Sequence, residues 1–303
     1  MPASESAPRI VCFGEMLYDH LPSGRFPGGA PMNVALHLLQ QGVDTQFISS
    51  VGPDEAGESL REYLAERGLP TDPIQTDADH PTGKVLADTT QADDVKYDIL
   101  HPVAWDFIEA DPAAVQAVKE TDLLLYGSLA ARSATSRRTL EQLLALAPRT
   151  AFDVNLRAPH YDQETITTLL KQANLVKLNE EEFALLTQWY FGGESTENTV
   201  NQLAERFQLD TVCITRGAAG AELWHEGQRW EQAGFPVTVA DTIGSGDAFL
   251  GTLLSKLLRG DPPPECLRYA CAVGAYVASQ PGATPRLNKE AIEKIARSDN
   301  PED

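Results

Sequence analysis

The sequence predicts an α/β fold, a doubly wound and mostly parallel sheet that is flanked by helices and carries a small β-sheet lid. Short apolar runs typical of strands alternate with helix-like runs through most of the 303 residues. Such alternation is typical of βαβ units with helices on both faces of a parallel sheet. Between about Thr82 and His101 the alternation stops, and two β-like runs flank a polar turn. This interruption predicts a hairpin outside the main sheet.

The first half of the chain begins with strand and helix signals in turn. The expected elements are, in order, a strand at 9–13, a helix at 33–41, a strand at 45–51, a helix from Asp54 to Gly68, and β-like runs at 84–89 and 96–100 around a turn at 91–94. Asp54 is a residue type that begins helices, and Gly68 is one that ends them. We expect about 16–27 and 82–106 to form the lid, inserted in a single domain of residues 1–303.

The alternation resumes at Asp122 and continues through the second half. The expected elements are strands at 123–126, 150–154, 175–178 and 211–215, helices at 133–146, at 164–171 and through Phe183 and Leu203, a hairpin across 221–230, and helices after Asp247 and at 265–279. In a doubly wound sheet, ligands bind outside the carboxyl ends of the strands. The residues of a binding site are therefore expected at those ends.

Composition disfavours several classes of protein. The net charge of -20 and the pI of about 4.6 work against binding to nucleic acids or to an anionic membrane surface. The four cysteines form no C-x-x-C pair, which fits a reducing compartment, and the six histidines are scattered rather than clustered as in zinc sites. The chain starts without the basic region of a signal peptide, and its first apolar run is too short to span a bilayer. These observations predict a cytoplasmic protein without nucleic-acid or membrane partners.

Residues 241–247, with the sequence DTIGSGD, lead directly into an apolar helix-like run. The amides of Gly244, Ser245 and Gly246 can close on a phosphate, and the helix N-terminus adds positive potential. A carboxylate beside such an anion hole has a use in phosphoryl transfer to an alcohol, because it can accept the hydroxyl proton. We therefore predict Asp247 as a catalytic base, the alternative being a helix acid that only favours the first turn. Two commoner nucleotide motifs, G-K-[S/T] and G-x-G-x-x-G, do not occur.

Two segments carry a resemblance to a known family. Residues 241–247 closely resemble the C-terminal signature D-T-x-G-A-G-D of the ribokinase-like, pfkB-type carbohydrate kinases, with Ser245 in the alanine position. Residues 28–35, with the sequence GGAPMNVA, resemble the N-terminal signature of the same family. The resemblance extends over essentially the whole chain. It implies a ribokinase-like fold, an ATP-dependent sugar kinase of the fructokinase-like branch, and Mg²⁺ and K⁺ as its ions.

A sugar site is expected near the N-terminal signature. Two adjacent glycines let the backbone approach a polyol closely, and an asparagine offers both a donor and an acceptor to vicinal hydroxyls. Asp19 can accept hydrogen bonds from two hydroxyls, and the plain alternative is a solvated loop acid. The sugar-binding residues that these considerations and the resemblance imply are Asp19, Gly28, Gly29, Asn33, Tyr97 and Arg157.

A nucleotide and ion site is expected in the C-terminal half. Asn179 followed by Glu182 is a capping-box pattern, which explains the pair without any ligand. The resemblance adds a second role, in which the glutamate organises the water shell of Mg²⁺, a hard cation that keeps several waters. The other residues implied by the resemblance are Asn179, Thr215, Gly217, Gly220 and Gly274 for ATP, and Asp241, Ile243 and Gly282 for K⁺. Many relatives have asparagine where this chain has Cys271, which leaves recognition of the base open.

The fructokinase-like segments are 14–19, 101–106 and Arg157, so the predicted reaction is fructose + ATP to fructose 6-phosphate + ADP. Arg157 equally suits the carboxylate of 2-keto-3-deoxygluconate, and a kinase of that acid stays an alternative. A ribokinase or nucleoside kinase on the same fold and a non-catalytic sugar-binding regulator are further alternatives, the last disfavoured by Asp247. The exposed edges of lid strands need partners, which predicts a homodimer through the lid.

Overall fold

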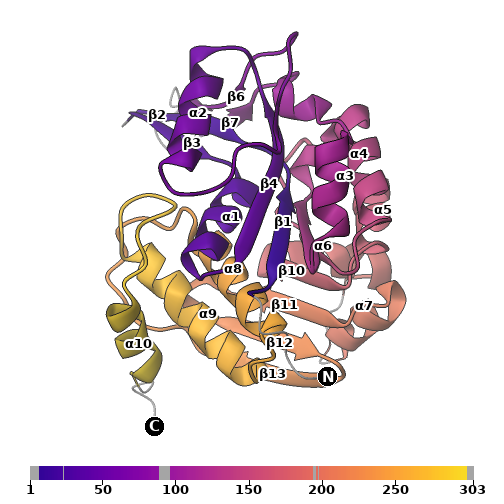
Figure 1. Cartoon of the computed structure of the whole chain (residues 1–303). Helices are drawn as coiled ribbons and strands as arrows, with labels where there is room; N and C mark the ends of the chain where they lie inside the picture. The colour runs from indigo at the N-terminus through magenta and orange to yellow at the C-terminus, as the bar shows by residue number, and fades with distance from the viewer. Residues whose placement is uncertain (1–6, 23, 89–95, 194–195, 197, 299–303) are drawn as a thin grey trace.

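The computed structural model describes residues 7–22, 24–88, 96–193, 196 and 198–298, apart from the side chains of residues 87, 88, 96 and 97. Within these residues the strands form a nine-stranded sheet in the order β13-β12-β11-β10-β9-β8-β1-β4-β5 and a four-stranded sheet in the order β3-β2-β6-β7. Figure 1 shows the larger sheet running through the middle of the molecule and the smaller one beside α2. The predicted α/β architecture with a separate small sheet is confirmed.

The main sheet is mostly parallel. Its strands are β1 (Arg9–Phe13), β4 (Asp44–Val51), β5 (Ile74–Thr76), β8 (Leu123–Gly127), β9 (Thr150–Asp153), β10 (Leu175–Asn179), β11 (Thr211–Thr215), β12 (Ala221–His225) and β13 (Gln228–Gln232). Neighbours from β5 to β11 pair in parallel, and the β12–β13 hairpin adds an antiparallel edge. The order of strands reverses between β1 and β8, so the carboxyl ends of these strands border the crevice where such sheets bind ligands.

Helices cover both faces of the main sheet. One layer holds α1 (Ala30–Gln40), α2 (Glu55–Ala65), α8 (Ser245–Leu258), α9 (Pro263–Ala278) and α10 (Lys289–Arg297), and the other holds α3 (Pro112–Lys119), α4 (Ala134–Leu144), α5 (Gln163–Leu170), α6 (Glu180–Phe191) and α7 (Thr199–Phe207) (Figure 1). An apolar core lies on each face of the main sheet, and alternate residues of β1 point into one core or the other. Val11 and Phe13 pack with α3 to α7, whereas Ile10 and Cys12 pack with α1, α2 and α8. The period of two along a strand requires this division.

The start of α1 differs from the prediction. We expected a helix at 33–41, and α1 begins at Ala30. Pro31 lies in its first turn, where the fixed φ of proline suits a helix and its missing N–H costs nothing. Asn33 is consequently inside the helix and is buried, rather than at its exposed beginning. By contrast, α2 begins as predicted, because the side chain of Asp54 accepts a hydrogen bond from the N–H of Gly57 at 2.9 Å.

The small sheet joins the two segments that we expected in the lid. Its strands are β2 (Leu17–Leu21), β3 (Gly24–Gly28), β6 (Gly83–Asp88) and β7 (Lys96–Ile99). β2 pairs antiparallel with β3 and parallel with β6, and β6 pairs antiparallel with β7. The predicted turn at 91–94 lies outside the described residues.

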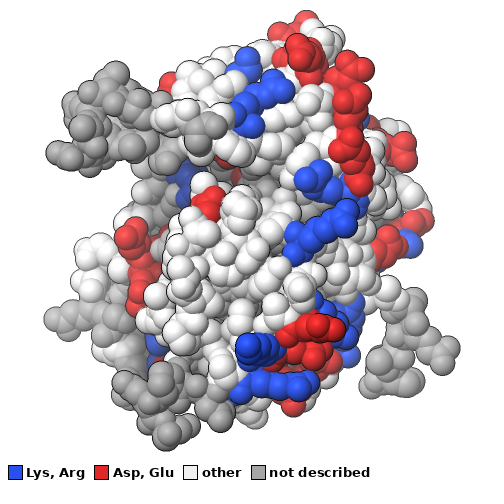
Figure 2. Space-filling model, turned by 90° about the vertical axis from the view of Figure 1, so that its left-hand side faces the viewer, with Lys and Arg blue, Asp and Glu red and all other residues white. Residues whose placement is uncertain are grey.

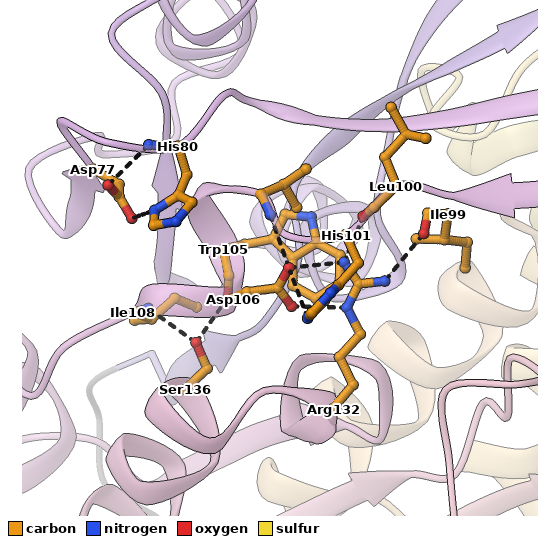
Figure 3. Close-up of polar contacts among 11 residues, drawn as sticks. Asp77, His80, Ile99, Leu100, His101, Trp105, Asp106, Ile108, Arg132 and Ser136 are labelled. Atoms are coloured by element: carbon orange, nitrogen blue, oxygen red, sulfur yellow. Dashed lines mark hydrogen bonds and ion pairs between the residues drawn. The ribbon is translucent and has the colours of Figure 1, made fainter.

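A buried ion pair holds the base of the small sheet (Figure 3). Arg132 donates from Nε and Nη2 to the carboxylate of Asp106, at 2.7 and 2.9 Å, and its guanidinium lies 3.9 Å from the ring centroid of Trp105. The same guanidinium donates to the carbonyls of Ile99 and Leu100 at the end of β7. Charged partners of this kind, fully enclosed and hydrogen-bonded on several sides, fix local geometry. The end of β7 is thereby attached to the main body.

The surface and the cysteines agree with the composition. On the face in Figure 2, basic side chains occur in small separate groups among acidic ones. All four cysteines are buried and unpaired. Of the helices in the described residues, none is long and apolar enough to cross a membrane.

Candidate active site

The two signature segments meet at the carboxyl edge of the main sheet. Asp247 lies in the first turn of α8, and the Nδ2 group of Asn33 in α1 donates to its Oδ2 at 2.8 Å. Gly244, which precedes the helix, has φ 77, a conformation that glycine adopts without strain. A Cβ on Gly244 would lie 2.2 Å from the carbonyl oxygen of Ala283, so a larger residue has no room here. The folded chain thus joins residues that are far apart in the sequence into one cluster.

The carboxylate of Asp247 has the properties of a base. Burial is the main reason that its pKa rises from 3.8 to about 6, and the neighbouring Asp153 adds to the increase. The hydrogen bond from Asn33 and the charges of Lys177 and Arg157 lower the pKa in part. At neutral pH the group is therefore ionised, yet it binds a proton more tightly than an ordinary aspartate. A base with a pKa close to the working pH is well suited to proton transfer.

The N-terminus of α8 leaves backbone donors available. Of the three predicted amides, that of Ser245 donates within the loop to the carbonyl of Thr242 at 3.3 Å. Among the residues that the structure describes, no protein acceptor contacts the N–H of Gly246 or of Asp247. Free N–H groups at the positive end of a helix form a site for an anion. This site adjoins the carboxylate of Asp247.

Lys177 is a charged residue of this cluster that our sequence reasoning missed. Its Nζ lies 3.0 Å from Oδ1 of Asp153, and both side chains are buried. A Cβ on Gly246 would lie 3.7 Å from the same Nζ, so the ammonium group is next to the N-terminus of α8. Burial opposes its charge, but Asp153, Glu182 and Asp247 outweigh that effect and raise the pKa of Lys177. A permanent positive charge therefore accompanies the free amides.

Glu182 connects two loops at the same edge. Its Oε2 accepts the N–H of Asn179 at 2.8 Å, and the side chain of Asn179 accepts the N–H of Glu182 at 2.9 Å, so the predicted capping box is confirmed. Its Oε1 accepts the N–H of Leu156 at 2.9 Å. Burial is the main cause that raises the pKa of Glu182. Each carboxylate oxygen has a remaining lone pair, which suits contact with the water shell of a cation better than direct ligation.

The predicted sugar-binding residues come from the small sheet, from the start of α1 and from the loop after β9. Asp19 is half-buried, and burial raises its pKa while the charge of Arg157 lowers it. A Cβ on Gly28 would lie 2.3 Å from Oδ2 of Asp19, so the absence of a side chain at Gly28 makes room for this carboxylate. Arg157 is exposed, and its guanidinium donates to the carbonyl of Leu156 at 3.0 Å. The side chain of Tyr97 lies outside the described part, although its backbone is in β7.

Gly29 and Glu15 are in close contact on the inner side of this region. A Cβ on Gly29 would lie 2.4 Å from the carbonyl oxygen of Glu15, which explains the glycine by protein contacts alone. The carboxyl of Glu15 is buried, which raises its pKa to about 7. Three buried acceptor atoms near the edge have no partner among the described residues, namely Glu15 Oε2, Asn33 Oδ1 and Asp153 Oδ2. Buried acceptors of this kind favour a bound group that supplies hydrogen-bond donors, such as a hydroxyl or a water.

A cavity of about 640 Å³ lies on the other side of the α8 N-terminus, and we call it the nucleotide cavity because residues predicted to bind ATP line it. It is bounded by the loop after β11, residues 234–239 and α9. Of the residues predicted for ATP, Thr215, Gly217, Gly220 and Gly274 line it, and so does Cys271. Asn179 is not among the residues that line this cavity, and its side chain caps α6.

The two loops predicted to hold a monovalent cation are in contact. Asp241 accepts the N–H of Ile243 at 3.0 Å and the N–H of Gly282 at 3.3 Å. From α1, Nε2 of His37 lies 3.0 Å from the carbonyl of Ala283. Burial lowers the pKa of His37 to about 4, so the ring is neutral and Nε2–H donates. The three residues predicted for K⁺ therefore lie together beside the anion site.

The family model of pfkB family carbohydrate kinases matches residues 9–290. Similar proteins include a fructokinase of Klebsiella pneumoniae, 29% identical over 92% of this chain and 96% of that protein, and a probable chloroplastic fructokinase-6 of Arabidopsis thaliana, 28% identical over 96% of this chain and 83% of that protein. A fructokinase double mutant from Vibrio cholerae O395, solved in its fructose-, ADP- and potassium-ion-bound form, has a TM-score of 0.83 at 25% identity and covers 97% of this chain and 100% of its own. The match of the family model to nearly the whole chain and the meeting of both signatures at one edge lead to the same conclusion: this chain belongs to the pfkB family of carbohydrate kinases.

Proposed function

We propose that the protein transfers the γ-phosphoryl group of ATP to a hydroxyl of fructose, giving fructose 6-phosphate and ADP. The observation that carries this proposal is the placement of Asp247. It combines a buried carboxylate of raised pKa, a hydrogen bond from Asn33 and the free amides of the α8 N-terminus. A base next to an anion site is the arrangement that phosphoryl transfer to an alcohol requires.

In the proposed reaction, the sugar hydroxyl donates its proton to Asp247 while its oxygen bonds to the γ-phosphorus. Asn33 holds one carboxylate oxygen, which leaves Oδ1 for the hydroxyl. The N–H groups of Gly246 and Asp247 and the ammonium of Lys177 stabilise the charge that develops on the phosphoryl oxygens. The small sheet would cover the sugar and exclude water, which otherwise competes as acceptor.

Cations are part of this proposal because the edge is acidic. Asp153, Glu182 and Asp247 lie near Lys177, and Glu15 lies near Asp247. These four acids outnumber Lys177 and Arg157, so a nucleotide polyphosphate would meet net negative charge. Mg²⁺ would neutralise phosphate charge, with Glu182 and Asn179 positioned to hold waters of its shell. Asp241 and the backbone of Ile243 and Gly282 offer oxygens to K⁺. The unpartnered Oδ2 of Asp153 fits an acidic site that receives a cation or its water.

The charges near the sugar favour a neutral substrate over a sugar acid. Arg157 is exposed, whereas Glu15 and Asp247 are enclosed and Asp19 is half-buried. The carboxylate of 2-keto-3-deoxygluconate would face these acids, and juxtaposed like charges oppose binding. The fructokinases among the similar proteins support the same choice.

A screen of ADP release tests the proposal. Fructose, ribose, tagatose, 2-keto-3-deoxygluconate and adenosine are compared at saturating ATP, with Asp247→Asn as the inactive control. We expect the highest kcat/KM with fructose. A higher kcat/KM with ribose, adenosine or the sugar acid would contradict the proposed substrate.

A homodimer through the small sheet is a second part of the proposal. Leu86 in β6 and Phe26 in β3 are large apolar side chains with 40% and 43% of their surface exposed. β3 is an edge strand of the small sheet, whereas β6 lies inside it. A free strand edge and exposed apolar side chains both favour association. Sedimentation of the wild type and of Leu86→Lys checks this, since a monomeric wild type would contradict it.

A further inference from the structure

Few side chains in the nucleotide cavity can form base-specific hydrogen bonds. Apart from Thr215, Thr242, Ser245 and Cys271, the described residues that line it are Gly, Ala, Val, Phe and Pro. Ser245 and Thr242 belong to the loop at the phosphate end, and Ser245 Oγ donates to the carbonyl of Thr242 at 2.8 Å. The hydroxyl of Ser245 is therefore occupied within this loop, next to the anion site.

The two other polar side chains offer little to a base. The hydroxyl of Thr215 donates at 3.4 Å to the carbonyl of Leu178, at the end of the neighbouring strand. Cys271 presents a thiol whose pKa is raised by burial, and a neutral thiol is a weak hydrogen-bond donor and acceptor. No charged group and no amide side chain lines the cavity among the described residues.

Much of the surrounding backbone is already hydrogen-bonded within the protein. The carbonyl of Ala278 accepts the N–H groups of Ala240 and Asp241, at 2.9 and 3.2 Å. In the loop after β11, the carbonyl of Gly220 accepts the N–H of Arg216 at 2.8 Å, and its own N–H donates to Gly217 at 3.1 Å. Gly274 and Ala275 lie inside α9. Gly220 and α9 therefore contribute apolar contact rather than base-specific hydrogen bonds.

The mouth of the cavity is open to solvent. Val239 lines it with 59% of its surface exposed. A purine that is stacked against Phe235 and the apolar face of α9 can keep its polar edge in water there. Adenine and guanine have the same bicyclic face and differ only in edge groups, and base stacking on apolar and aromatic walls tolerates any base. Edge groups that stay hydrated do not discriminate between the two.

We propose that this kinase uses purine nucleoside triphosphates in general as phosphoryl donors, GTP and ITP as well as ATP. The proposal rests on the sugar kinase function above and specifies its second substrate. With GTP, the sugar oxygen bonds to the γ-phosphorus, the bond to the bridging β–γ oxygen breaks, the hydroxyl proton passes to Asp247, and GDP leaves. Sites that hydrogen-bond a distinguishing group discriminate by about 10⁴-fold or more, whereas apolar pockets reach only about 10²-fold. We therefore expect kcat/KM for GTP within about tenfold of that for ATP.

Two measurements test this. Chromatography of the nucleoside diphosphate formed with fructose gives kcat/KM for ATP, GTP and ITP, and calorimetric titration gives Kd for ADP and GDP without any sugar. A preference for the adenine nucleotide above about tenfold in either measurement would overturn the proposal. The titration separates this proposal from the proposed function, because similar Kd values with no turnover of fructose would refute only the latter.

Variants at Cys271 test whether the purine base lies next to this residue. Cys271→Ala removes the thiol and should leave the ATP-to-GTP ratio of kcat/KM within about threefold of the wild type, whatever the absolute rates. Cys271→Asn introduces an amide with a donor and an acceptor, which fits one purine edge better than the other, and should change the ratio by about tenfold or more. A changed ratio in Cys271→Ala would mean that the thiol discriminates, and an unchanged ratio in Cys271→Asn would place the base elsewhere; either result overturns the proposal.

Discussion

Replacement of Asp247 by asparagine tests the mechanism most directly. The amide oxygen of the introduced side chain can accept the same hydrogen bond from Asn33, which the wild type makes at 2.8 Å, so the shape of the site is kept. Only the negative charge and the basic oxygen are lost. Loss of a general base typically costs about 10²- to 10⁴-fold, and we expect kcat to fall by at least about a hundredfold. Affinity for ATP should stay equal or increase, because the carboxylate repels the γ-phosphate.

The stability of Asp247→Asn gives a second, independent result. The pKa of Asp247 rises from 3.8 in the unfolded chain to about 6 in the fold, so the folded state binds this proton more tightly. Ionisation of Asp247 therefore lowers the free energy of unfolding. This loss is absent below pH 3.8, grows between pH 3.8 and 6, and reaches up to about 3 kcal/mol above pH 6. At pH 7 the neutral asparagine should increase the free energy of unfolding.

If Asp247 only favoured the first turn of α8, the variant would show the opposite changes in stability and turnover. Removal of its charge should cost about 0.3 to 1 kcal/mol of stability and leave kcat nearly intact. Glu265, in the first turn of α9 and exposed, is the matched control, and Glu265→Gln should behave in this way. Turnover, ATP titration and urea denaturation are measured on both variants. Near-normal turnover in Asp247→Asn would refute the base.

Three further predictions concern the charged groups of the site. The kcat/KM for fructose should decline as the pH falls through about 6, because protonated Asp247 cannot accept the hydroxyl proton; a flat profile from pH 8 to 5 would show that this group is not the base. Lys177→Met leaves Asp153 buried without its partner and should cost about 3 to 5 kcal/mol in urea denaturation, together with lower kcat; a loss below about 1 kcal/mol would mean that the pair is not enclosed as described. Activity should increase when K⁺ replaces tetramethylammonium at equal ionic strength, and equal rates in the two salts would remove the cation site from the proposal.

Local sequence patterns were sufficient to predict the main sheet and most of its helices. The apolar runs that became β1, β8 and β11 are each flanked by polar residues, so strand and helix signals alternate without ambiguity. The start of α1 was placed too late, because Pro31 was taken as part of the loop although proline is favoured in a first helical turn. The meeting of Asn33 with Asp247 followed from the resemblance and not from any local pattern.

The residues that escaped prediction act through tertiary contacts. Lys177 lies in an otherwise apolar strand, which was a usable signal, but its partner Asp153 and its position beside Gly246 appear only when β9, β10 and α8 come together. Glu15 follows β1 without any motif of its own, and burial by the surrounding elements gives it its raised pKa. The prediction that Gly28 lets the backbone approach a polyol did not include the room that this glycine leaves for the carboxylate of Asp19.

One helix, α1, contacts both the site proposed for the sugar and the site proposed for the monovalent ion, which would connect their occupancies. Asn33 and His37 are four residues apart in α1 and so lie on the same side of the helix, where one contacts Asp247 and the other the loop of Ala283. A sugar bound to Asn33, as proposed, would also restrict the loop of Ala283 beside the proposed ion site. Thermodynamic reciprocity then applies, so an ion that tightens sugar binding by about tenfold is itself bound about tenfold more tightly when the sugar is present.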